Sequence, residues 1–157
     1  MEKYIQSFMK VCESVFRGFC RTEVKAGEMF YLTRDKRELG WDISGIIGFS
    51  GQISGVVSLS MKDNVAFQVT KTLTGADHNV FDADVIDAIG EIINIISGNF
   101  KKEFETSLRT AISIPSIIQG KDHRLNWPSK NISVICIPFS IFSDKELFLS
   151  IAVDETK

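Results

Sequence analysis

Apolar side chains recur at every third or fourth position in three stretches of the chain, which is the spacing of an amphipathic helix. The pattern predicts helices over residues 2–20, 62–73 and 82–105. Gly75 follows the second segment, where a glycine can adopt the left-handed conformation that ends a helix. Asp82 opens the third and longest segment, and a carboxylate at this position is a favoured N-cap. The sequence therefore predicts one long and two shorter helices.

Alternation of apolar and polar residues, the period of a β-strand, marks the regions between these helices. Strands are predicted over residues 41–49 and 52–61, with Ser50-Gly51 at the turn of the hairpin that joins them. Another strand is predicted over residues 110–118, where Pro115 either ends the strand or places it at the edge of a sheet.

The C-terminal part of the chain predicts a loop and a second hairpin. Residues 119–130 are polar and are expected to form the loop, and strands are expected over residues 131–141 and 145–153 with a turn at Ser143-Asp144. This order of elements indicates an α/β fold of the α+β kind, in which a mostly antiparallel sheet packs against long helices. A single domain is expected over residues 1–157.

Composition and charge narrow the classes of function. The chain has 157 residues, of which 44% are hydrophobic and 24% charged, and this is enough for a sizeable core. The formal net charge is −2, and the basic residues are scattered, whereas a nucleic-acid binder gathers them on one face. No apolar run is long enough to span a membrane, and the N-terminus lacks a secretory pattern. These features predict a cytoplasmic protein that binds no nucleic acid.

The cysteines and histidines form no metal-binding or disulfide pattern. Cys12 and Cys20 are expected in one helix, about 12 Å apart along its axis, which is too far for a disulfide. Together with Cys136 they are expected to be buried free thiols. His78 and His123 are far apart in the sequence and are interpreted as surface loop residues, so no zinc site is predicted.

One face of the long helix carries an unusual polar ridge. Asp87, Glu91, Asn94 and Gly98 lie at positions i, i+4, i+7 and i+11, within about 60° of one another on the helix surface. Asparagine and glycine are poor helix formers, glycine by about 1 kcal/mol relative to alanine. The ridge is therefore either an ordinary polar face or a site where another protein approaches the helix.

The run DAIGEIINIISG, from Asp87 to Gly98, resembles the signature of the CheX/CheC chemotaxis phosphatase family. That signature has an acid or serine, a glutamate four residues later, an asparagine three residues after that, and a proline further on, which Pro115 supplies. A single Glu-x-x-Asn site is similar to the CheX branch of the family. The resemblance implies the α+β fold over nearly the whole chain and a homodimer.

The function implied by this resemblance is hydrolysis of the phosphoaspartate of a CheY-like response regulator, in the two-component signalling of chemotaxis. Asn94 would position the attacking water, because an amide donates and accepts hydrogen bonds but is no base at neutral pH. Glu91 would contact the regulator's active-site lysine, and Asp87 and Gly98 would help docking. The phosphorylated partner would supply Mg²⁺, and no cofactor or metal of the chain's own is expected.

Two other functions remain open at this stage. The chain could instead be a non-catalytic binding module for a response regulator or flagellar switch, since that class is similar in fold. It could also be a structural homodimer that buries the ridge at its own interface. The apolar segments 132–141 and 147–153 are expected to include an edge strand available for pairing between subunits.

Overall fold

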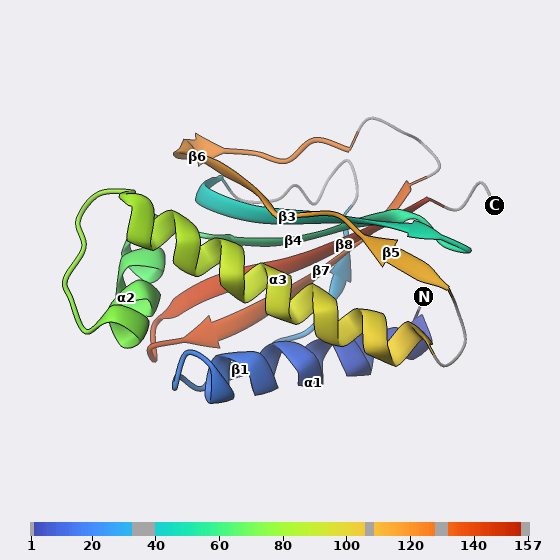
Figure 1. The fold of residues 1–157 in the computed structure, drawn as a ribbon, viewed down its shortest axis with the longest axis horizontal. Coiled ribbons are helices and arrows are strands. Elements are labelled where there is room, and N and C mark those ends of the chain that lie inside the picture. Colours follow the sequence, from blue (N-terminus) through green and yellow to red (C-terminus); the bar gives the residue numbers. More distant parts are fainter. Residues whose placement is uncertain (1, 33–39, 106–108, 128–131, 155–157) are drawn as a thin grey trace.

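The computed structural model describes residues 2–32, 40–105, 109–127 and 132–154. In these residues three helices pack on an eight-stranded sheet, which confirms the predicted α+β fold class (Figure 1). In chain order the elements are α1 (Glu2–Gly18), β1 (Val24–Ala26), β2 (Phe30–Tyr31), β3 (Trp41–Gly51), β4 (Gly55–Met61), α2 (Asp63–Thr74), α3 (Ala83–Glu105), β5 (Thr110–Ile112), β6 (Ser116–His123), β7 (Ile132–Ile141) and β8 (Lys145–Asp154).

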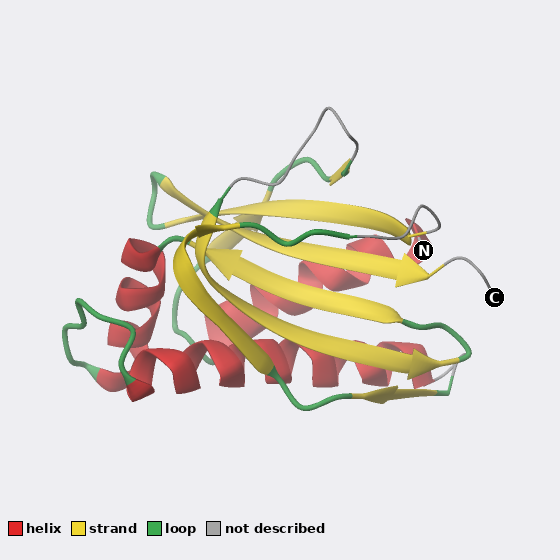
Figure 2. Ribbon diagram, turned by 90° about the horizontal axis from the view of Figure 1, so that it is seen from above, coloured by secondary structure: helices red, strands yellow, loops and turns green. Residues whose placement is uncertain are grey.

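The strands form one antiparallel sheet in the order β1-β7-β8-β4-β3-β5. β2 also pairs with β7, and β6 pairs with β3, so β5 and β6 follow one another along β3. The three helices lie on one face of the sheet (Figure 2). As a result, α3 has the sheet on one side and leaves its opposite side to solvent.

Hydrophobic side chains fill both faces of the central strands. In β7, Ile135 faces the main core beneath the helices, whereas Val134 and Cys136 belong to a smaller cluster on the opposite face. Trp41 and Phe148 anchor this second cluster, with ring centroids 4.8 Å apart. Burial on both faces explains why β7 and β8 are nearly continuous apolar runs and not alternating ones.

The predicted helices are confirmed with small shifts at their ends. α1 ends at Gly18, so Phe19, which falls within the helix predicted over residues 2–20, lies beyond the helix and is 39% exposed. α2 ends at Gly75, whose φ of 74° is the predicted left-handed C-cap and whose N–H donates to the carbonyl of Lys71. Cys12, Cys20 and Cys136 are buried free thiols, as predicted.

The first hairpin turns later than the sequence indicated. β3 continues to Gly51 and β4 begins at Gly55, so the turn consists of residues 52–54 and not of Ser50-Gly51. Ser50 and Gly51 pair with β5 on the other side of β3. This long-range partner keeps the two residues in the strand, and local turn chemistry gives no sign of it.

The strand predicted over residues 110–118 is in fact two strands, β5 and β6, separated by the link Ser113–Pro115. Pro115 thus interrupts an edge of the sheet, as expected. β6 continues to His123, so the loop predicted from residue 119 is wrong in its first part. Pairing with β3 holds these polar residues in a strand. The last part of that predicted loop, residues 128–130, lies outside the described residues.

The C-terminal hairpin is confirmed, but its place in the sheet differs from expectation. β7 lies between β8 and the short strands β1 and β2, and β8 lies between β7 and β4. Neither is an edge strand, so the prediction that these segments offer an edge to a second subunit is wrong. β1 and β2 escaped the sequence analysis because segments of three and two residues are too short to show a period. Residue 131 lies outside the described residues.

Asp42 is a buried carboxylate that ties three elements together, and the sequence pattern contains no sign of it. The residue is 5% exposed. Its Oδ2 accepts a hydrogen bond from the N–H of Asp63 in α2 (3.1 Å), and its Oδ1 accepts one from the N–H of Asp122 in β6 (3.0 Å). Lys62 Nζ lies 3.7 Å from Oδ1. Burial raises the pKa of Asp42, but the two backbone donors and Lys62 outweigh it and the pKa is lowered.

We expect Asp42→Asn to lower the free energy of unfolding by about 1–3 kcal/mol at pH 7, because an amide N–H would face a buried donor. A lowered pKa in the folded state means that the carboxylate stabilises the fold above its ordinary pKa of about 3.9. That contribution is lost as the pH falls through this value and then through the pKa of the folded state. Urea unfolding of both proteins between about pH 7 and about pH 2 measures the difference, because the loss begins near pH 3.9 and continues below it.

Asp77→Asn is the matched control for this prediction. Asp77 pairs with Lys71 at the surface, and its side chain is 86% exposed. Its replacement is expected to leave the unfolding free energy unchanged, because exposed ion pairs contribute little. The assignment of a lowered pKa would be contradicted if the difference in unfolding free energy between wild type and Asp42→Asn stayed constant down to the lowest pH.

Candidate functional site

The helix that carries the polar ridge starts at a well-defined cap. Asp82 Oδ1 accepts a hydrogen bond from the N–H of Val85 (3.0 Å), and the Asp82 carbonyl accepts one from the N–H of Ile86 (3.1 Å). This confirms the predicted N-cap. A hydrogen bond from His78 and the Val85 N–H lower the pKa of the Asp82 carboxyl. The start of α3 is therefore fixed at the position that the sequence indicated.

His78 links the end of α2 to this cap. Its Nδ1 lies 2.9 Å from Asp82 Oδ2, and its Nε2 lies 3.1 Å from Thr74 Oγ1. The side chain is only 4% exposed, so the interpretation as a surface residue is wrong for His78. Asp84 also lies close enough to form a three-residue group with His78 and Asp82. Because His78 and Asp82 are already bonded to each other and to the helix ends, their role here is to position α3.

His123 is likewise part of the fold and not a free surface group. Its Nε2 lies 2.8 Å from Ser44 Oγ in β3, and its Nδ1 lies 2.8 Å from the carbonyl oxygen of Gly120. Ser44 Oγ in turn lies 2.7 Å from Ser60 Oγ. Ser44 and Ser60 are fully buried, so their hydroxyl groups are out of reach of a substrate, and the hydrogen bonds to His123 fix the end of β6 on β3.

The inner face of α3 holds the helix tightly on the sheet. Ile89 and Ile93 are fully buried and face Gly45 of β3. A Cβ atom placed on Gly45 would lie 3.0 Å from Ile93 Cγ2 and 3.3 Å from Ile89 Cγ2, so a larger residue here would push the two isoleucines back by a few tenths of an ångström. Because α3 packs closely on the sheet here, the residues on the outer face of the same turns are also held in a fixed position.

The outer face of α3 presents the predicted ridge to solvent. Asp87, Glu91 and Asn94 are exposed, and Gly98 is half-buried, yet a Cβ atom placed on it would have no other group within 4 Å. The ridge is about 16 Å long, from the rise of 1.5 Å per residue. Among the described residues, no hydrogen bond or ion pair engages the side chains of Asp87, Glu91 or Asn94. The structure thus places all four predicted residues along one open surface.

β6 and the link before it run along one side of α3 (Figure 1). A Cβ atom on Gly90 would lie 3.9 Å from Ile117 Cδ1 of β6, and Ser97 faces the same pocket as Ile112 of β5. Asn94 lies between Gly90 and Ser97 on the helix, so its turn is the one beside the link Ser113–Pro115.

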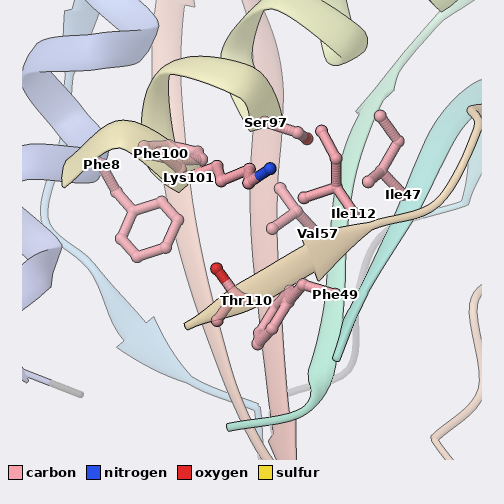
Figure 3. A pocket seen from close by; sticks show the side chains of 9 residues that line it. All are labelled: Phe8, Ile47, Phe49, Val57, Ser97, Phe100, Lys101, Thr110 and Ile112. Atoms are coloured by element: carbon pink, nitrogen blue, oxygen red, sulfur yellow. The ribbon is translucent and has the colours of Figure 1, made fainter. Parts of the chain in front are cut away.

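A small apolar pocket lies beneath the C-terminal half of α3 (Figure 3). Its cavity volume is only about 20 Å³, which is room for about one water molecule. Ser97 Oγ is buried in it without a hydrogen-bond partner among the described residues, and Lys101 contributes the charged group. The remaining lining is almost entirely apolar: Phe8, Ile47, Phe49, Val57, Phe100, Thr110 and Ile112. Such a lining offers no acid–base pair, so the candidate chemistry belongs to the ridge.

The exposed groups define what this surface can do. An amide can hold a water molecule by donating one hydrogen bond and accepting another, and a carboxylate can pair with a cation of a partner. Asn94 and Glu91 provide these two functions one helical turn apart. Neither side chain lines the pocket beneath the helix, so a substrate must bring the other reacting groups on a complementary surface. Within the described ranges of the chain, no helix has both the length and the apolar character to cross a membrane.

Comparisons with known proteins relate the chain to chemotaxis phosphatases. The profile of the chemotaxis phosphatase CheX family matches residues 43–140. The chain is 27% identical over 119 residues to the CheY-P phosphatase CheX of Thermotoga maritima, covering 74% of each protein. It resembles the crystal structure of the chemotaxis protein CheX from Vibrio vulnificus, with a TM-score of 0.86, 25% identity and coverage of 96% and 99% of the two chains. It also shares the fold of a chain in the CheX–CheY–BeF3–Mg complex from Borrelia burgdorferi (TM-score 0.79, 23% identity, coverage of 97% and 98%).

Proposed function

Because the chain belongs to the chemotaxis phosphatase CheX family, it is a phosphatase of phosphorylated CheY-type response regulators, and we propose that Asn94 and Glu91 carry this activity. The observation that supports these roles is the pair itself: both side chains are exposed, unpaired among the described residues and one turn apart on a rigidly packed helix. The proposed phosphatase domain spans residues 1–157 and has this one Glu-x-x-Asn site.

Asn94 acts on the water in the proposed reaction. The oxygen of that water forms a bond to phosphorus while the bond between phosphorus and the aspartyl oxygen breaks. The electron pair of the broken bond leaves with the carboxylate, and the protons of the water pass to phosphate and solvent. The products are inorganic phosphate and the free aspartate of the regulator. Since an amide takes up no proton at neutral pH, Asn94 contributes by holding the water in line with the bond that breaks.

The other ridge residues bind the regulator in the proposed complex. Glu91 pairs with the lysine of the regulator's active site and so fixes how α3 enters it. Asp87 adds a second carboxylate one turn earlier. Gly98 keeps the surface low where the regulator approaches the helix backbone, consistent with the empty space around its Cα.

The regulator completes the active site. The complex from Borrelia burgdorferi contains CheY, BeF3 and Mg²⁺ together with CheX. By analogy, the Mg²⁺ that neutralises charge on the phosphoryl group here comes with the regulator, and the chain uses no cofactor of its own. We place the reaction in the cytoplasm and the chain in a homodimer. Light scattering of the purified protein tests the dimer by its mass.

Dephosphorylation of a purified receiver tests the function directly. CheY-type receivers from the same organism are phosphorylated with a small-molecule donor, the donor is removed, and phosphoaspartate is followed with Mg²⁺ present. Wild-type protein in catalytic amounts is expected to accelerate the decay. Tight binding without acceleration would favour the non-catalytic binding module, and a ridge that is inaccessible in the assembled protein would favour the structural homodimer.

Glu91→Ala separates docking from chemistry in the same assay. We expect KM to rise by roughly 10-fold or more, because the regulator's lysine would lose its charged partner in a desolvated contact. Asp87→Ala is the matched control on the same face, and a smaller rise in KM is expected for it. A larger rise in KM for Asp87→Ala than for Glu91→Ala would contradict the assignment of Glu91 as the more important docking carboxylate.

A further inference from the structure

Ile114 is the most exposed large apolar side chain in the described part of the chain, at 83%. It lies in the link Ser113–Pro115 between β5 and β6, beside the turn of α3 that carries Asn94. Single exposed apolar residues are common on protein surfaces and need no function. The backbone that holds Ile114 and the position of this link distinguish it from such residues.

The backbone around Ile114 is fixed on the sheet from both sides. The N–H of Ser113 donates to the carbonyl of Gly48 (2.8 Å), and the N–H of Gly48 donates to Ser113 Oγ (3.0 Å). Ser113 Oγ donates in turn to the carbonyl of Ile114 (2.9 Å). Pro115 restricts its own φ angle and the conformation of the residue before it. Ile114 is therefore presented to solvent by a backbone with little freedom to lose on binding.

The register places this link beside the centre of the ridge and not at its end. Ile112 pairs with Phe49, and Ser116 pairs with Ile46, so the link crosses β3 at the level of Ile47 and Gly48. On the helix side, its neighbours are the turns from Gly90 to Ser97. A regulator that brings its phosphoaspartate to Asn94 must therefore cover the link as well, because a specific interface covers about 800 Å² on each partner.

We propose that Ile114 is an apolar anchor of the surface that docks the phosphorylated regulator. This inference rests on the proposed function of the ridge and adds a second element, the link Ser113–Pro115, to the helix. The occupant is the receiver domain itself, through an apolar patch beside its acidic phosphorylation pocket. In this interface Glu91 forms the charged contact with the regulator, and Ile114 forms the apolar contact beside it.

Kinetics with the phosphorylated receiver test this proposal. Ile114→Ser is expected to raise KM by roughly 5- to 30-fold and to leave kcat within about twofold, because Ile114 touches the partner and not the water. Ile114→Leu restores most of the affinity. Binding of the BeF3–Mg²⁺ form of the receiver is expected to weaken by the same factor. Folding is not at risk, because the side chain is 83% exposed, and thermal unfolding verifies this.

Val80→Ser is the matched control. Val80 is 60% exposed and precedes α3, whose first residue, Ala83, lies about 16 Å from Asn94 along the helix axis. The KM of the Val80→Ser variant is expected to equal that of the wild type. Wild-type activity with an unchanged KM in Ile114→Ser would overturn the anchor and leave the proposed function intact. A wild-type protein that neither binds nor dephosphorylates any receiver would overturn the proposed function and the docking surface together.

Discussion

Replacing Asn94 with alanine is expected to lower the kcat for phosphoaspartate hydrolysis by about 100-fold or more. The estimate follows from the loss of a single positioned hydrogen-bonding group in other enzymes and from the role of water-positioning glutamines in GTPases. The rate of hydrolysis cannot fall below that of the regulator's own slow dephosphorylation, because the Mg²⁺ and the lysine of the regulator remain. Stopped-flow or fluorescence decay of the phosphorylated receiver measures kcat and KM separately.

Two features of the structure make this variant a clean test. Asn94 is exposed, and alanine is the best helix former, so α3 should be unchanged or slightly more stable. Glu91 remains to dock the regulator, so binding of the BeF3–Mg²⁺ receiver should persist. Asn94→Gln retains the amide but moves it outward by one methylene, and is expected to recover only part of the rate. A wild-type rate in Asn94→Ala would remove this residue from the mechanism.

The sequence predicted the positions of the ridge residues more completely than it predicted the sheet. The ridge from Asp87 to Gly98 could be predicted because all its members lie on one helix, where the period of 3.6 residues relates sequence distance to spatial position. Asp82 and Gly75 were predictable for a similar reason, since caps are local features. The exposed positions of Asp87, Glu91 and Asn94 follow from the burial of Ile89, Ile93 and their neighbours on the other face.

Features that depend on long-range pairing could not be predicted. The turn of the first hairpin shifted because β5, which lies about 60 positions later in the sequence, pairs with Ser50 and Gly51. β6 extends through polar residues because β3 supplies its hydrogen bonds. The buried position of Asp42 could not be predicted for the same reason, since the N–H groups that bond to its carboxylate come from α2 and β6.

Ile114 was missed for a different reason. The residue lies in the segment ISIPSII, where the sequence predicted a strand that Pro115 ends or places at a sheet edge, and nothing local indicates that this one isoleucine points to solvent. Only the paired positions on either side, Ile112 with Phe49 and Ser116 with Ile46 of β3, show that the ladder is interrupted at residues 113–115. The proline that follows provided a partial signal, because it predicted an interruption at this place.

Gly98→Leu is expected to make the helix more stable and the enzyme less active. Glycine costs a helix interior about 1 kcal/mol relative to alanine, and leucine is nearly as good a helix former as alanine. No other group lies within 4 Å of a Cβ atom placed on Gly98, so the new side chain meets no clash within the described residues. Tm should therefore rise by about 2–4 °C, as expected for a gain of 1 kcal/mol in a protein of this size.

The activity should change in the opposite direction. A leucine at this position would stand between the helix and the approaching regulator, so KM is expected to rise by roughly 10-fold or more. Gly90→Ala is the matched control, because its Cβ would make only an ordinary contact of 3.9 Å with Ile117 and lies off the ridge. It should gain similar stability and keep the wild-type KM. If Tm rises in both variants but KM rises only in Gly98→Leu, the glycine at position 98 is retained for access to a partner at the expense of helix stability. If KM is the same in both variants, Gly98 has no part in docking.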